Sequence, residues 1–572
     1  MRPAPPTGPA TGDAPPGRWA RPGRPLRPWW LLLAPAVTVL LRLPFVLGRA
    51  GLYGSDTYLH LRIVRDWVAS SAWPATLAGH VPQYLDYEAW PGAHAFAAAA
   101  AQMGADPLAF MQWAPLAGLF LLDLAVVLAI ARRADARVAV AGGVLFGLAD
   151  HIFFQTQWYT PELLALPLVG ALLLNELSVH RRSLSLLVLT ALLVTHHLSF
   201  LVGLLLFMLL TPWAPRRWLL ACVAYLLAVS MAFWGWLPPW VGSVGDLRAM
   251  MGGATPALFM AAVVLGLLGL RWAVEAVSAR LSDRAAGGPL LGLLPRGWRR
   301  AGRPAVAIVV LVAAGAIALA LGPPVGDGGI GVQPTKLLVL AGGLMFVAWV
   351  PAESLALRLV SAAGLLGLLM LLNPLVFESV PINIRFLEFI YMPGFILPGM
   401  AASVLIGGAR RRAVAVLLAL ALAAPVLLAD DVVRYQSDGA QRFIFSESDL
   451  DFAREVGSAT EPDAIIAAPF ALSAMIQGIA DRATAVGPIR KAVDTDGYWA
   501  ALADLDALAR GGNPVYLVHT SDRSRYIEEA GDRVSQEDVS RLAASLDDLT
   551  GAFEPVLELG PHALYRYHPS AP

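Results

Sequence analysis

The chain has little charge, only two lysines and a single cysteine. Charged residues make up 15% of its 572 residues and hydrophobic residues 57%, whereas about a quarter of an ordinary soluble domain is charged. This composition excludes a soluble enzyme of the usual kind. Because Cys222 is the only cysteine, no intramolecular disulfide can form, and its apolar surroundings favour a role as a small hydrophobic side chain. The net charge is zero, and nothing in it indicates a nucleic-acid partner.

The apolar residues are gathered in runs long enough to cross a bilayer, which takes about 20 helical residues. These runs predict a polytopic α-helical membrane protein with about 13 transmembrane helices. The expected spans are 29–48, 108–131, 138–150, 161–178, 184–196, 197–213, 217–237, 256–271, 304–322, 336–351, 354–374, 387–407 and 413–429. The spans 184–196 and 197–213 are short, so a re-entrant hairpin is the alternative to two separate spans there.

Arginine clusters indicate how these helices are oriented. Residues 1–28, rich in proline, glycine and arginine, are expected to form a disordered cytoplasmic leader. With the N-terminus inside, the dense basic loops all fall on the cytoplasmic side, at 132–137, 181–182, 216–217, 271–303 and 410–412. Nearly every Asp, Glu and His outside those loops falls on the opposite side. We therefore expect a protein of the cell membrane whose reactive or binding site lies at its extracytoplasmic face.

The charge and the pattern of secondary structure in the sequence change after the predicted transmembrane domain, 29–430. Residues 431–572 contain 23 Asp and Glu against 12 Lys and Arg, which leaves 19 against 30 in the preceding part. Short β-like runs at 464–468, 515–519 and 563–567 alternate with helical patterns at 449–457, 498–509 and 538–548. This alternation predicts an α/β domain, and the predicted spans place it outside the cytoplasm.

The loop after the first span carries the first candidate site residues. Asp56 is followed by His60 and Arg62, which puts an acid/base group and a cation near the lipid headgroups. In such a site, the acid/base group could deprotonate an acceptor and the cation could hold a lipid phosphate. The alternative of equal weight is that Asp56 only caps a helix over 57–67.

A second polar segment precedes the span that begins near residue 161. It contains Asp150 and His151 and ends at Glu162, where an ionised carboxylate is costly unless it is paired, metal-bound or at the aqueous edge. Favourable interaction with the helix dipole would explain Glu162 but not the dense polar and aromatic run before it. His196 and His197 are expected to mark the turn between two short spans, with one of them facing a cavity.

Three further candidates lie late in the transmembrane domain. Lys336 opens a span directly after a glycine-rich segment that could close over a substrate, although a plain mobile loop explains that segment equally simply. Arg385 lies at the outer end of another span, where it could snorkel or grip a phosphate, and Tyr391 follows it within the same span.

Taken together, these motifs resemble the GT-C membrane glycosyltransferases, and most closely the catalytic subunit of oligosaccharyltransferase. Gly54-Ser55-Asp56 resembles the family's first acidic motif, Thr160-Pro161-Glu162 is similar to the second with Thr160 in place of its first carboxylate, and Arg385-Phe386 resembles the arginine near the lipid-linked sugar. The resemblance covers residues 29–430. Besides Thr160, the chain departs from the family because residues 431–572 contain no Trp-Trp-Asp sequence, the motif with which oligosaccharyltransferases recognise Asn-x-Ser/Thr acceptors.

The resemblance implies an inverting glycosyltransferase that takes a sugar or oligosaccharide from a polyprenyl-phosphate carrier to an extracytoplasmic glycan, lipid or protein. Asp56 is expected to be the general base or a metal ligand, and Glu162 to complete the site with Asp150 or His151. Asp56, Glu162 and Asp150 are the expected ligands of a divalent metal, Mg²⁺ or Mn²⁺. Arg385 and Lys336 are expected to neutralise the departing lipid phosphate, with His60, Arg62, His151 and Tyr391 as further substrate-binding residues. The alternatives are a lipid-linked sugar flippase or other transporter and a non-catalytic scaffold.

Overall fold

The structure is a computed structural model, and it describes the N-terminal part of the membrane domain and most of the C-terminal domain. The described residues are 28–70, 91–132, 136–148, 152, 156–179, 181–210, 444–486, 488–489, 498–526, 536–548 and 552–569, with scattered residues in 222–232 and at 392. The predicted leader and most of the predicted spans after residue 213 lie outside these ranges.

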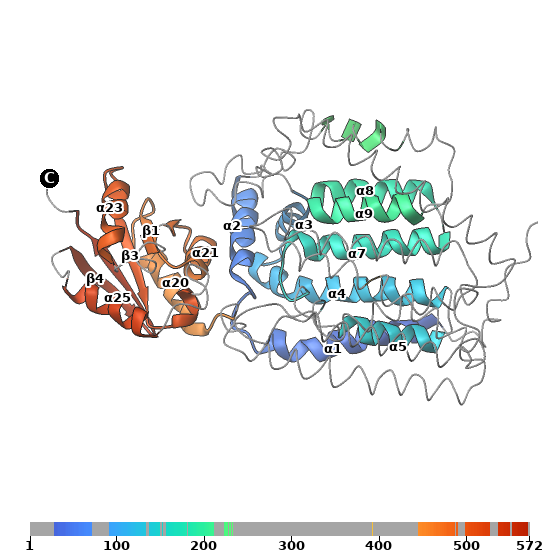
Figure 1. Cartoon of the computed structure of the whole chain (residues 1–572), viewed down its shortest axis with the longest axis horizontal. Helices are drawn as coiled ribbons and strands as arrows, with labels where there is room; N and C mark the ends of the chain where they lie inside the picture. The colour runs from blue at the N-terminus through green and yellow to red at the C-terminus, as the bar shows by residue number, and fades with distance from the viewer. Residues whose placement is uncertain are drawn as a thin grey trace, which may run out of the picture.

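The described part of the membrane domain is a bundle of apolar helices that lie side by side (Figure 1). The helices are η1 (Pro28–Leu32) with α1 (Leu33–Leu47), α4 (Pro107–Ala131), α5 (Ala136–Gly147), α7 (Pro161–Leu174) with the π-helical turn η3 (Asn175–Val179), α8 (Arg182–Thr195) and α9 (His197–Leu210). Helices were predicted in all of these regions, and those predictions are confirmed.

Among the described residues, three helices are long and apolar enough to cross a membrane, at Trp29–Leu47, Pro107–Ala131 and Pro161–Ser178. Leu122, Val126, Leu166, Val169 and Leu189 are fully buried or nearly so, and they belong to the core that joins α4, α7 and α8. The two 14-residue helices α8 and α9 are each about 21 Å long at 1.5 Å per residue, shorter than the roughly 30 Å hydrocarbon core. The predicted break between them at His196 is confirmed.

Two further helices stand at one end of this bundle. They are α2 (Ser55–Ser70), whose range includes the predicted helix 57–67, and α3 (Pro91–Gln102), which was not predicted. Figure 1 shows α2 lying across the end of the bundle, between it and the C-terminal domain. The buried residues of α2 include Tyr58, Leu61 and Val64, so its apolar side is covered by packing.

The C-terminal domain is built on a five-stranded mixed sheet of order β2-β1-β3-β5-β4. Strands β1, β2 and β3 are parallel, whereas β5 is antiparallel to β3 and β4. Its elements are α20 (Glu447–Ala459), β1 (Ile465–Ala467), α21 (Phe470–Ala480), β2 (Ala483–Ala485), α23 (Tyr498–Ala509), β3 (Val515–Thr520), η5 (Arg523–Tyr526), α25 (Gln536–Asp548), β4 (Phe553–Leu559) and β5 (His562–Tyr567). The predicted α/β domain is confirmed, with α21, β2 and β4 as additions.

Candidate active site

Asp56 lies in the first turn of α2, directly after a tight turn, and its side chain is half-buried. Gly54 in that turn has a φ of +80°, a conformation that favours glycine. A Cβ at position 54 would come within 2.7 Å of the Trp158 ring. The Thr57 hydroxyl donates to the Tyr53 carbonyl at 2.7 Å and closes the turn. Glycine is therefore required here both by the backbone conformation and by the ring that packs against it.

Trp158 belongs to the segment that leads into α7, so the Asp56 turn lies against the approach to Glu162. The Tyr53 and Trp158 rings meet edge to face, with centroids 5.5 Å apart. The next residue, Tyr159, is buried and its hydroxyl donates to the Ala93 carbonyl of α3 at 2.7 Å. Two acidic motifs that are far apart in the sequence thus come from neighbouring segments at one end of the bundle.

Glu162 is buried and faces a histidine from the turn between α8 and α9. Its Oε1 atom lies 3.3 Å from His196 Nε2, and the residue is 7% exposed. The backbone N–H of Ser199 donates to His196 Nδ1 at 3.3 Å. Because that donor requires a lone pair on Nδ1, the proton of the neutral ring lies on Nε2, on the side of the ring that faces Glu162. His196 is buried at the turn between α8 and α9, and the prediction that one of these two histidines faces a cavity stays a prediction.

The two predicted substrate-binding residues of α2, His60 and Arg62, have partners elsewhere in the protein. His60 is 1% exposed, and its Nδ1 lies 2.9 Å from Nε2 of His94 on α3. Burial, and secondarily His94, lowers the pKa of His60 well below its usual value. Arg62 pairs with Asp66 at 2.9 Å and with Asp481 of the C-terminal domain. The binding roles of His60 and Arg62 stay predictions.

The remaining candidates, Asp150, His151, Lys336, Arg385 and Tyr391, lie outside the described residues. Within the described ranges, no three His, Cys, Asp or Glu side chains gather closely enough to hold a metal ion. Thr160 is buried, and its hydroxyl has no hydrogen-bond partner in the part of the chain that the structure describes. It occupies the position of the first carboxylate in the second acidic motif of the GT-C family. A metal held by Asp56, Glu162 and Asp150 stays a prediction.

Sequence reasoning missed a buried polar cluster within the bundle. Arg42 of α1 is 2% exposed and donates to the Thr156 hydroxyl at 3.2 Å and to the Gly147 carbonyl at 2.5 Å. Asp123 of α4 is completely buried and accepts from the Thr38 hydroxyl at 3.0 Å. Arg42 therefore bonds to both sides of the segment that contains Asp150 and His151. The signal that could have found this cluster is an ionisable residue inside an apolar run, which is rare in membrane helices.

The described arginines of the predicted cytoplasmic loops lie at the other end of the same helices. Glu162 starts α7, whereas Arg181 and Arg182 follow the end of that helix and open α8. Likewise, Arg132 follows the last residue of α4. The candidate acidic residues and the arginine clusters are thus separated by the length of the bundle, as the predicted sidedness requires. Which end faces the cytoplasm stays a prediction.

Comparison with known proteins identifies the fold. No family model and no curated protein matches the sequence. The archaeal oligosaccharyltransferase AglB from Archaeoglobus fulgidus, solved with an inhibitory peptide and a dolichol-phosphate, is similar with a TM-score of 0.52, 13% identity and coverage of 95% of this chain and 74% of AglB. The apo form of the A. fulgidus oligosaccharyltransferase gives a TM-score of 0.51 at 13% identity, covering 95% and 75%. This chain therefore has the fold of the GT-C membrane glycosyltransferases, as the motif resemblance implied.

Proposed function

We propose that this protein is an inverting membrane glycosyltransferase that moves a sugar or oligosaccharide from a polyprenyl-phosphate-type donor to an extracytoplasmic acceptor. The observation that carries the proposal is the packing of the Asp56 turn against Trp158, which brings the Glu162 segment alongside it. The fold shared with AglB supports a transferase over a flippase. In AglB the fold accommodates a dolichol-phosphate and a peptide.

In this proposal Asp56 acts as the general base, or as a metal ligand, at the acceptor. It removes the proton of an acceptor hydroxyl, whose oxygen attacks the anomeric carbon from the face opposite the phosphate. The bond from that carbon to the phosphate oxygen breaks, and the polyprenyl phosphate leaves with the electron pair. General-base help contributes typically about 10²–10⁴-fold to such a step. The acceptor is a glycan, lipid or protein. Asn-x-Ser/Thr peptides are disfavoured as acceptors, because the chain lacks the Trp-Trp-Asp motif with which oligosaccharyltransferases recognise them.

Glu162 and the predicted residues outside the described ranges complete the proposed site. His196 Nε2 lies 3.3 Å from the buried Glu162 carboxyl and helps to fix its position in the proposed site. Mg²⁺ or Mn²⁺ bound by Asp56, Glu162 and Asp150 would supply charge neutralisation for the leaving phosphate. In this proposal, Lys336 and Arg385 also neutralise the charge of the leaving phosphate, and His151 and Tyr391 bind the substrate.

The test is transfer by purified protein in nanodiscs. The donors are a panel of radiolabelled polyprenyl-phosphate monosaccharides, and the acceptor is a cell-envelope extract, with and without a chelator. Asp56→Asn and Glu162→Gln should each lower transfer about 10²-fold or more while the proteins remain folded. The matched control is Asp451→Asn, an exposed residue of α20 that should transfer normally. Normal transfer by a folded Asp56→Asn protein would refute the assignment, and donor flipping without transfer would favour the transporter alternative.

A further inference from the structure

The C-terminal domain packs directly on the helix that carries Asp56. Gly478 of α21 lies so close to α2 that a Cβ at position 478 would come within 2.5 Å of the Tyr58 carbonyl oxygen. Arg65 donates to the Gly478 carbonyl, and Arg62 donates to the Gln477 carbonyl at 3.5 Å. Tyr58, Arg62 and Arg65 follow one face of α2 at helical spacing. This face of α2 is therefore held against α21, as their positions in Figure 1 show.

The start of α2 is fixed by the same domain. The Tyr58 hydroxyl accepts a hydrogen bond from the Leu52 backbone N–H at 3.0 Å, and its ring meets Phe445 edge to face at 5.2 Å. A Cβ at Gly51 would lie 3.1 Å from the Leu450 side chain. Because Asp56 lies between Gly51 and Tyr58, its turn is enclosed by the C-terminal domain on one side and by Trp158 on the other.

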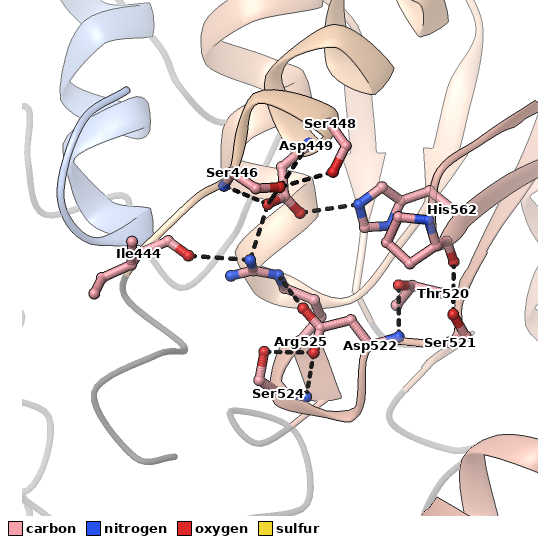
Figure 2. A network of polar contacts seen from close by, with 11 residues as sticks. Ile444, Ser446, Ser448, Asp449, Thr520, Ser521, Asp522, Ser524, Arg525 and His562 are labelled. Atoms are coloured by element: carbon pink, nitrogen blue, oxygen red, sulfur yellow. Dashed lines mark hydrogen bonds and ion pairs between the residues drawn. The ribbon is translucent and has the colours of Figure 1, made fainter. Parts of the chain in front are cut away.

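Phe445 is in turn held by a buried ion pair, drawn in Figure 2. The Arg525 guanidinium lies over the Phe445 ring at 4.8 Å and donates to the Ile444 carbonyl at 3.0 Å. It also donates to Asp449 Oδ2 at 2.9 Å, and Asp449 Oδ1 lies 2.9 Å from His562 Nε2. The side chains of Arg525, Asp449 and His562 are 5% exposed or less. A hydrogen-bonded network that is buried in this way favours a single geometry.

We infer that the C-terminal domain positions the Asp56 turn for catalysis, through Phe445 and Tyr58 at the start of α2 and through Gly478 along it. The inference rests on the proposed function. These three residues would act through their contacts at and along α2, so we assign them as positioning residues. The expected effect follows from geometry, because a misplacement of about 1 Å at a catalytic group can lower the rate about 10²-fold.

Two variants of the full chain test this inference independently. Gly478→Ala pushes against the Tyr58 carbonyl, and Phe445→Leu removes the ring that Tyr58 meets. The control is Gly457→Ala, whose new Cβ would lie 3.3 Å from Ala480, within the C-terminal domain. For each test variant we expect kcat to fall about 10-fold to 100-fold, a donor KM close to that of the parent, and faster amide hydrogen exchange in residues 52–58. Gly457→Ala should leave kcat and that exchange unchanged.

The outcomes separate this inference from the proposed function. If Asp56→Asn is inactive while both folded test variants transfer with the parent's kcat, the positioning role is wrong and the proposed function stands. If Asp56→Asn transfers normally, the proposed function itself fails. If the control Gly457→Ala loses as much activity as Gly478→Ala and Phe445→Leu, the losses reflect general destabilisation, and the inference is also overturned. If Gly478→Ala does not fold, Phe445→Leu decides the question alone.

Discussion

The buried Asp449 carboxylate should make the C-terminal domain sensitive to acid. Burial on its own would raise the pKa of Asp449, but hydrogen bonds from His562 and Ser446 and the charge of Arg525 outweigh it and lower the pKa to about 2, from a usual value of 3.8. A difference of nearly two pKa units corresponds to about 2 kcal/mol. Because the folded pKa is lowered, this stabilisation is fully present above about pH 5 and is lost as the pH falls toward about 2.

The substitution Asp449→Asn isolates that contribution. Asparagine keeps the shape but leaves the Arg525 charge buried without its carboxylate, which typically costs about 3–5 kcal/mol. We would follow hydrogen exchange of β3 in intact protein and compare each variant with the parent at the same pH. Asp449→Asn should speed exchange at least about 10²-fold at pH 7 and much less near pH 2, where about half of the parent carboxyl groups are protonated and most of the stabilisation is lost. The control Asp451→Asn, 56% exposed in its ion pair with Arg454, should change little at either pH. Equal exchange in the two variants at pH 7, or a difference that persists unchanged at pH 2, would refute the reasoning.

Three further predictions concern the membrane domain. His196→Ala should lower transfer about tenfold because the buried Glu162 side chain loses the polar ring that lies 3.3 Å from it. His196→Gln should restore part of the loss, and transfer assays that find both variants at the parent's rate would contradict this. Arg42→Lys should destabilise the protein by about 1–3 kcal/mol, because lysine lacks the guanidinium fork whose two nitrogens reach Thr156 and Gly147 separately. An unchanged midpoint in thermal unfolding would count against it. Gly143→Ala should cost about 1–3 kcal/mol, because the new Cβ would lie 2.2 Å from Val127; the same thermal assay decides, and parent-like stability would show that α4 and α5 tolerate the methyl group.

The helices were predictable from the sequence where a single physical signal was strong. The run at 108–131 is apolar apart from Gln112 and Asp123, and α4 follows it to within one residue at its start. The break at His196 was predictable because two adjacent polar rings interrupt an apolar stretch. In contrast, α3 was missed because its alanine-rich core, with small side chains, has no marked helical periodicity.

In the C-terminal domain, the strands β1, β3 and β5 were predicted, whereas β2 and β4 were not. All residues of β3 are buried, and their pattern is clear in the sequence. Strand β4 has the sequence FEPVLEL, in which Pro555 and two glutamates weaken the strand signal at the sheet edge. The strand β2 has only three residues, too few for any pattern. Tertiary pairing, which no local signal reports, decides such segments.

The Asp56 and Glu162 motifs could be identified from the sequence, but their neighbours could not. The Trp158 ring lies against Gly54 because two loops meet at the end of the bundle. The Arg42 contacts and the Phe445–Tyr58 contact join residues that lie far apart in the chain. Spacing along the sequence carries no information on contacts of this kind, since they depend on how whole helices are placed.

The most direct test of the central claim is to map where a lipid-linked sugar binds. A polyprenyl-phosphate sugar with a photoreactive group on the sugar would be cross-linked to the protein in nanodiscs, and the labelled peptides identified by mass spectrometry. We predict labelling in residues 51–62 and 156–166, and its loss on competition with unlabelled donor. Labelling confined to residues 128–137 and 178–186, at the arginine-rich end of the bundle, would contradict the account.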